Sequence, residues 1–204
     1  MTNPLLADWQ TPFAIAPFDR ISDEDFAPAF EAALQEARAE VEGIANNPAP
    51  ATFANTIEAL ECSGKALDQV LSVFFTLAGA DSNPARQALQ RDFGPKLAAH
   101  ASELYGNKAL FARVEALWQA RADLALTAEE DRLLMLTHRA FRRAGAALTG
   151  DDEARMRAIM ARLAELGTAF TQNLLADEAG WHMELGETDL GGLPDFVVAS
   201  ARAA

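Results

Sequence analysis

The chain contains little of what several classes of protein need. Cys62 is the one cysteine among its 204 residues, so no intrachain disulfide can form. Positive charge is also sparse, since 17 Lys and Arg stand against 30 Asp and Glu and the formal net charge is −13. Phosphate contacts need a basic face, so we expect no nucleic acid and no membrane surface as a partner. No apolar run approaches the roughly 18 residues that a membrane span requires.

The first ten residues, MTNPLLADWQ, lack the basic region and apolar stretch of a signal peptide. Together with the single cysteine, this favours a reducing, cytoplasmic location. Half of the residues are hydrophobic and 23% are charged, which is too apolar a composition for intrinsic disorder. We therefore expect a folded chain that buries roughly 70% of its unfolded surface.

Helical periodicity is the main feature that the sequence does have. From Phe26 to Ile44, apolar residues recur every three or four positions behind the N-cap candidate Ser22. Pro28 is expected to kink this helix or to separate its first turn, because proline lacks the amide hydrogen. Start and stop signals predict further helices from Thr52 to the break at Ser63-Gly64, from Leu67 to Ala78, from Asn83-Pro84 to Glu103 with a kink at Phe93-Gly94-Pro95, from Asn107, from Thr127, and from Asp151 to Asp177.

The pattern changes after Gly180. Trp181 to Leu185 alternates between the two faces of an extended chain, which predicts one short strand. Pro194 fits the first position of a last helix. The sequence shows no internal repeat. It therefore predicts one all-α domain over residues 1–204, with seven or eight helices and a short extended segment near residues 181–185.

The three histidines are the first candidates for chemistry. His100 and Glu103 lie three apart on a helix and could present two ligands to a metal, but no third ligand is apparent, so we expect a solvated or capping role. His182 is expected to be structural. His138 lies in the most basic stretch of the chain, together with Arg132, Arg139, Arg142 and Arg143. The simplest interpretation of this stretch is a solvated helix face that pairs with nearby carboxylates. The alternative is that it anchors the carboxylate of a ligand or partner.

Cys62 is the remaining candidate. Its one basic neighbour is Lys65, so a buried, inert thiol is a better interpretation than a nucleophile. Gly191-Gly192 lacks the spacing and the lysine of a phosphate-binding loop. The phenylalanines lie on the helical stripes and indicate core packing. The residues alone thus predict an acidic helical domain with no catalytic, cofactor-binding or metal-ligating residue of its own.

Seven ordered segments carry a resemblance to a known family. They are Asn3–Leu6 with Trp9 and Pro12-Phe13, Ala27–Leu34, Thr52–Glu61 with Ser63-Gly64, Asn107–Val114, Gly145–Leu148, Phe170–Leu174 and Leu190–Pro194. This set resembles the N-terminal region of the thimet-oligopeptidase-like zinc metallopeptidases, the family of bacterial oligopeptidase A and peptidyl-dipeptidase Dcp. Ala54 departs from the pattern, since members usually carry glutamate there.

The resemblance implies an architectural role for this chain. In such enzymes a second, longer region carries the HExxH motif, whose histidines bind zinc and whose glutamate activates water. The three histidines here do not form that motif, so no catalytic residue is carried over. We expect one helical wall of a deep channel that admits short peptides, belonging to a longer metallopeptidase whose catalytic zinc domain is absent here, and inactive by itself.

One alternative is a stand-alone helical module that binds a peptide or protein without catalysis. Self-association through an uncovered apolar face would accompany either interpretation. A thiol enzyme using Cys62 is a third, weaker alternative. Endopeptidase and dipeptide-releasing specificities are not separable on these residues.

Overall fold

The computed structural model describes residues 3–203, apart from the side chains at positions 157, 161, 164, 168 and 179. The described residues form helices and no strand, so the all-α prediction is confirmed. Contacts divide the chain into two units, Met1–Thr149 and Gly150–Ala204. The single domain expected over residues 1–204 stays a prediction. None of the described helices is both long and apolar enough to cross a bilayer.

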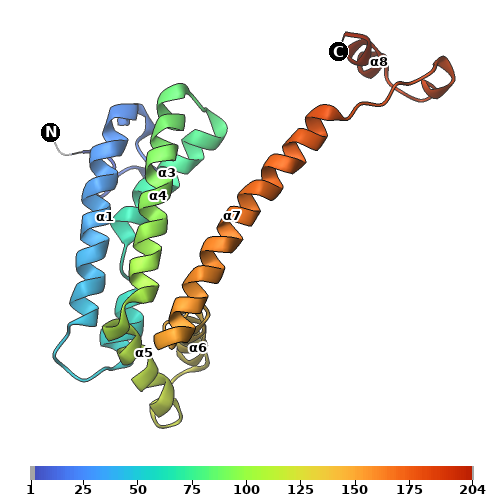
Figure 1. Cartoon of the computed structure of the whole chain (residues 1–204). Coiled ribbons are helices and arrows are strands. Elements are labelled where there is room, and N and C mark those ends of the chain that lie inside the picture. Colours follow the sequence, from blue (N-terminus) through green and yellow to red (C-terminus); the bar gives the residue numbers. More distant parts are fainter. Residues whose placement is uncertain (1–2, 204) are drawn as a thin grey trace. The chain divides into compact units, whose positions relative to one another are not determined.

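The first unit is a layered set of helices in which α1, α3 and α4 lie side by side (Figure 1). Short 3-10 turns, η1, η2 and η4, precede α1 or follow α5. A π-helical segment, η3, leads directly into the single turn of α2. The bounds are η1 Pro12–Ala14, η2 Phe18–Arg20, α1 Asp23–Ala45, η3 Phe53–Glu58, α2 Ala59–Glu61, α3 Lys65–Ala80, α4 Pro84–Gly106, α5 Lys108–Ala120, η4 Arg121–Asp123 and α6 Ala128–Arg143.

The predicted helix starts are confirmed, because each depends on hydrogen bonds within one turn. The side-chain oxygen of Asn83 accepts a hydrogen bond from the backbone N–H of Arg86 at 2.8 Å, and that of Asn107 accepts one from the N–H of Leu110 at 2.9 Å. Thr127 and Glu130 form the predicted capping box, with the Glu130 N–H donating to the threonine hydroxyl at 3.3 Å. At Ser22 the backbone N–H donates to the carboxylate of Asp25 at 2.8 Å.

Pro28 does not separate the first turn of α1, since the helix runs unbroken from Asp23 to Ala45. Likewise Pro95 lies inside a continuous α4. A proline removes one backbone hydrogen bond, but Phe26, Phe30 and Phe93 beside these prolines are fully buried. Their burial stabilises the turns on either side of each proline and offsets the lost bond. The kinks expected at both prolines stay predictions.

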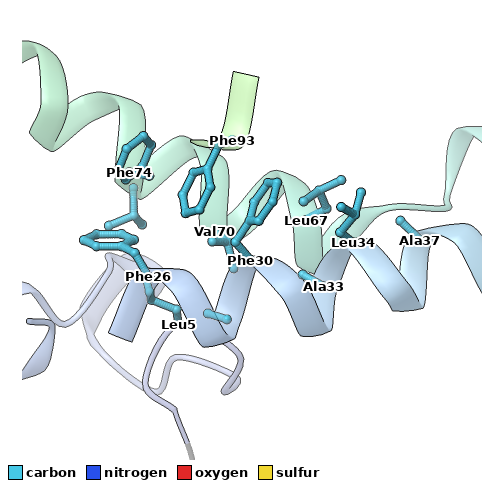
Figure 2. Packing of buried hydrophobic residues seen from close by; sticks show 12 residues of the cluster. Leu5, Phe26, Phe30, Ala33, Leu34, Ala37, Leu67, Val70, Phe74 and Phe93 are labelled. Atoms are coloured by element: carbon cyan, nitrogen blue, oxygen red, sulfur yellow. The ribbon is translucent and has the colours of Figure 1, made fainter. Parts of the chain in front are cut away.

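Four phenylalanine rings form the centre of one core cluster in this unit. Figure 2 shows Phe26 and Phe30 of α1 meeting Phe74 of α3 and Phe93 of α4. The Phe30 and Phe93 rings stack with centroids 3.9 Å apart, and Phe93 lies 4.9 Å from Phe74. The prediction of core packing is therefore confirmed for these four residues.

A second core cluster lies further along α1. It joins the C-terminal part of α1 to η3, α5 and α6 through Val41, Ile57, Leu110, Val114 and Phe141. One long helix thus contributes to both clusters, with Phe26 to Ala37 in the first and Val41 to Ala45 in the second. The space between the two clusters is where a groove opens.

The second unit contains α7 (Gly150–Gly180), η5 (Glu187–Asp189) and α8 (Asp195–Ala203). Taken by itself it buries none of its described side chains. The apolar stripe of α7 is exposed in it and comprises Ile159, Met160, Leu163, Leu166, Phe170 and Leu174.

Residues 181–185 form no strand, so that prediction is wrong. A strand needs backbone partners from another strand, and the part of the chain that the structure describes offers none. The last helix, α8, begins at Asp195, one residue after the predicted first position at Pro194. The carbonyl oxygen of Pro194 accepts from the N–H of Val198 at 3.2 Å.

Candidate functional site

A groove between the two core clusters is the candidate site. Its volume is about 430 Å³, and residues of α1, α2, α3, α4 and α6 line it together with the turn at Ser63-Gly64. A larger hollow has described lining residues only from one short stretch near the end of α7, namely Ala176, Asp177, Glu178, Gly180 and Trp181, so it shows no walls from separate elements. Pockets of a few hundred Å³ between helices of a bundle are typical ligand sites. The apolar floor comprises Val41, Leu67, Leu71, Leu97, Leu104 and Phe141.

Small side chains create the space. Ala37, Ala101 and Ala140 come from three different helices and all line the groove. Larger residues at these positions would fill it, because facing helices otherwise interdigitate to close packing.

The break between α2 and α3 shapes one wall of the groove. Gly64 has φ +74°, a left-handed conformation that a residue with a Cβ adopts only at a cost. Its backbone N–H donates to the Glu40 carboxylate at 2.7 Å. The Ser63 hydroxyl donates to the Leu60 carbonyl at 2.7 Å. The break predicted at Ser63-Gly64 is therefore confirmed.

Two carboxylates stand on the groove wall. Glu61 and Asp68 line it, both residues are exposed, and neither forms an ion pair with a described cation. His100 and Tyr105 line it as well. The groove thus combines an apolar floor with negative charge.

His100 is half-buried, and its Nδ1 atom is buried without a hydrogen-bond partner. Burial lowers the pKa of its imidazole, and the positive charge of Arg38 lowers it further, against the opposing effect of Glu103. The ring is therefore neutral at pH 7. The expectation of a solvated or capping histidine is wrong, because the packing of α4 on α1 covers this face of the helix.

Glu103 does not act with His100 as a ligand pair. Its carboxylate accepts from Nε of Arg38 at 2.9 Å and from Nη2 of the same residue at 3.3 Å. Among the described residues, no group of three His, Cys, Asp or Glu side chains gathers as a metal site.

His138 is buried rather than solvated, at 5% exposure. Its Nε2 lies 2.7 Å from Oε2 of Glu115 on α5, and its ring stacks on Trp118 with centroids 4.5 Å apart. Hydrogen bonds from Gln119 and His138 lower the pKa of Glu115, against the effect of its partial burial. His138 therefore joins α6 to α5. Its spacing to Leu134 and Phe141, on the buried face of the same helix, is the signal that sequence reasoning missed.

The four arginines around His138 are exposed, so the expected solvated helix face is confirmed. Among the described residues none of the four forms a direct ion pair with a carboxylate, although the charge of Arg142 adds to the hydrogen bonds of Gln119 and His138 in lowering the pKa of Glu115. No carboxylate lies three or four positions from the last three of them along α6. The alternative, an anchor for a carboxylate, stays a prediction. The four are Arg132, Arg139, Arg142 and Arg143.

Cys62 is exposed, so the prediction of burial is wrong. The hollow beside it is lined by Glu40, Asn47 and Asn55 among others and contains no basic residue. The lining therefore supplies no positive charge that would mark a reactive cysteine, which supports an inert thiol. His182 is exposed in the second unit, and no hydrogen bond holds it among the described residues, so no structural role is found for it.

Comparison with known proteins shows that the chain is similar in sequence to bacterial peptidases. No protein-family profile matches the chain. The dipeptidyl carboxypeptidase of Salmonella typhimurium is 40% identical over 205 residues, which cover 100% of this chain and 30% of that protein. Its Escherichia coli counterpart is 38% identical over 203 residues, 99% of this chain and 30% of that protein. Oligopeptidase A of Escherichia coli is 28% identical over 204 residues, 100% of this chain and 29% of that protein.

The resemblance stated from the sequence is thereby confirmed. The chain spans less than a third of the length of the curated relatives that it matches. The match is consistent with an N-terminal region of these peptidases.

Proposed function

We propose that this chain is the N-terminal helical, channel-wall region of a zinc metallopeptidase that hydrolyses short peptides. The observation that carries the proposal is the similarity to dipeptidyl carboxypeptidase, 40% identity along the whole chain. Because oligopeptidase A is less similar, at 28%, release of dipeptides is favoured over internal cleavage.

Zinc would be held by another part of the longer protein. The residues described here do not fit a zinc site, because no three potential ligands converge and the carboxylate of Glu103 is already bound by Arg38. This chain would contribute shape and peptide contacts, and no step of hydrolysis is assigned to its side chains.

The apolar stripe of α7 supports a further packing partner. An amphipathic helix gains its stability by burying that face, and the second unit by itself leaves Leu163 57% and Phe170 70% exposed. We propose that the catalytic domain covers this surface in the longer protein. In its absence, a second copy of the chain would cover it.

The test is hydrolysis of a quenched fluorescent peptide of five to ten residues, about the size a narrow channel admits, by the chain with and without zinc. We expect no cleavage by the chain and chelator-sensitive cleavage by a longer product that continues into an HExxH region. Cleavage by the chain alone that a chelator abolishes would contradict the proposal.

The second candidate function is a helical module that binds peptides or proteins without catalysis. The groove favours it, since it is a formed pocket lined by residues of five helices. The coding sequence beyond Ala204 discriminates the two. An in-frame HExxH supports the peptidase, and a stop codon supports the module.

A further inference from the structure

We propose that the groove between α1, α3, α4 and α6 binds the free N-terminal residue of a short peptide whose first side chain is apolar. The side chain would lie on the apolar floor, and the α-ammonium group would lie beside Glu61 and Asp68. This rests on the proposed function only in taking a peptide as the ligand.

The size and lining of the groove fit one or two residues. Its volume of about 430 Å³ lies near the lower end of the range for ligand pockets, roughly 300–1,000 Å³. Leu67, Leu71, Leu97 and Leu104 supply aliphatic surface from two helices. Moving an apolar side chain from water onto such a surface is favourable in proportion to the area covered.

The charges favour a cation over a carboxylate. Glu61 and Asp68 have no described cationic partner, and the whole chain carries a net charge of −13. Lys65 lies between them in sequence at the exposed start of α3, but it does not line the groove. Arg38 and Glu103 neutralise each other near His100. A peptide N-terminus is therefore attracted, whereas its C-terminus is repelled.

His100 suits this ligand in two ways. Its neutral ring does not repel an ammonium group, and its buried Nδ1 lacks a partner. A buried polar atom without a hydrogen bond costs free energy, and an N–H group of a ligand that reached it would remove that cost.

The binding experiment uses the full chain and a tripeptide amide, Phe-Ala-Ala-NH₂, with its N-acetylated twin as the neutral control. Titration followed by amide chemical shifts locates the contact. We expect the free peptide to bind at least tenfold more tightly than the acetylated one, with the largest shifts at groove residues such as Leu71 and Ala101. Equal affinities, or shifts confined to other surfaces, would overturn the proposal.

Matched variants separate charge from shape. The double variant Glu61→Gln, Asp68→Asn is expected to remove the preference for the free amine, whereas Glu58→Gln, an equally exposed neighbour outside the groove, leaves it intact. Ala101→Phe fills the groove and should abolish binding. Ala99→Phe places the same side chain on the exposed far side of α4 and should not.

If both phenylalanine variants bind the peptide equally well, the groove is not the site. Circular dichroism before titration verifies that each variant is folded, and the carboxylate variants test the proposal whatever the outcome for Ala101→Phe. Peptide hydrolysis by the longer protein is measured separately, so the proposed function survives or fails independently of this binding.

Discussion

Phe93→Ala tests whether the aromatic cluster holds α4 against α1 and α3. Phe93 is fully buried, its ring stacks on Phe30 at 3.9 Å, and it lies 4.9 Å from Phe74. Truncating a buried phenylalanine costs about 3–5 kcal/mol through lost burial and the cavity left behind. Losing two ring contacts places this variant in the upper half, about 4 kcal/mol.

That loss is a large share of the roughly 5–15 kcal/mol that stabilises a typical domain. For a chain of this size it corresponds to a fall in Tm of roughly 8–16 °C, at about 2–4 °C per kcal/mol. Urea unfolding followed by circular dichroism measures it. Phe75→Ala is the matched control, because this neighbouring phenylalanine is 43% exposed. A loss below about 1 kcal/mol for Phe93→Ala, or equal losses for both variants, would refute the packing argument.

Three further predictions concern hydrogen-bonded pairs. Asn83 and Arg86 both donate to Asp23 at 2.7 Å and lower its pKa, so Asp23→Asn should cost about 1 kcal/mol at pH 7. Because the pKa of Asp23 is lower in the folded chain than in the unfolded chain, the ionised carboxylate stabilises the fold above its unfolded pKa, and this stabilisation is lost as the pH falls through the folded pKa. The difference in unfolding free energy between Asp23→Asn and the unsubstituted chain, measured with urea, should therefore shrink as the pH is lowered. Glu115→Gln should show the same pH dependence, because the pKa of Glu115 is also lowered; an unchanged difference at low pH would contradict it. Thr127→Ala removes the cap of α6 and should lower stability by roughly 1 kcal/mol in thermal unfolding, with restoration by Ser.

Sequence reasoning missed the groove because its residues lie far apart along the chain. Ala37, Ala101 and Ala140 read as ordinary helical alanines, and only the packing of three helices leaves space above them. For the same reason Cys62 was expected to be buried and is exposed, whereas His138 was expected on a solvated face and is buried. The burial of each residue depends on which other helix covers it, and Glu115, the partner of His138, lies on a different helix.

The sequence by itself determined the helix starts at Asn83, Asn107 and Thr127, the break at Gly64 and the all-α class. Each of these depends on hydrogen bonds or backbone conformations within a few residues, which the local order of amino acids dictates. Its ordered motifs also determined the resemblance to peptidases. Only the tertiary structure decided the continuity of α1 through Pro28, the absence of a strand at 181–185 among the described residues, and the groove with its unpaired His100. These features depend on contacts between distant segments of the chain. The free energy gained from burying apolar side chains in such contacts can exceed the cost of one proline in a helix, and it can override the structure that a short stretch of sequence favours by itself.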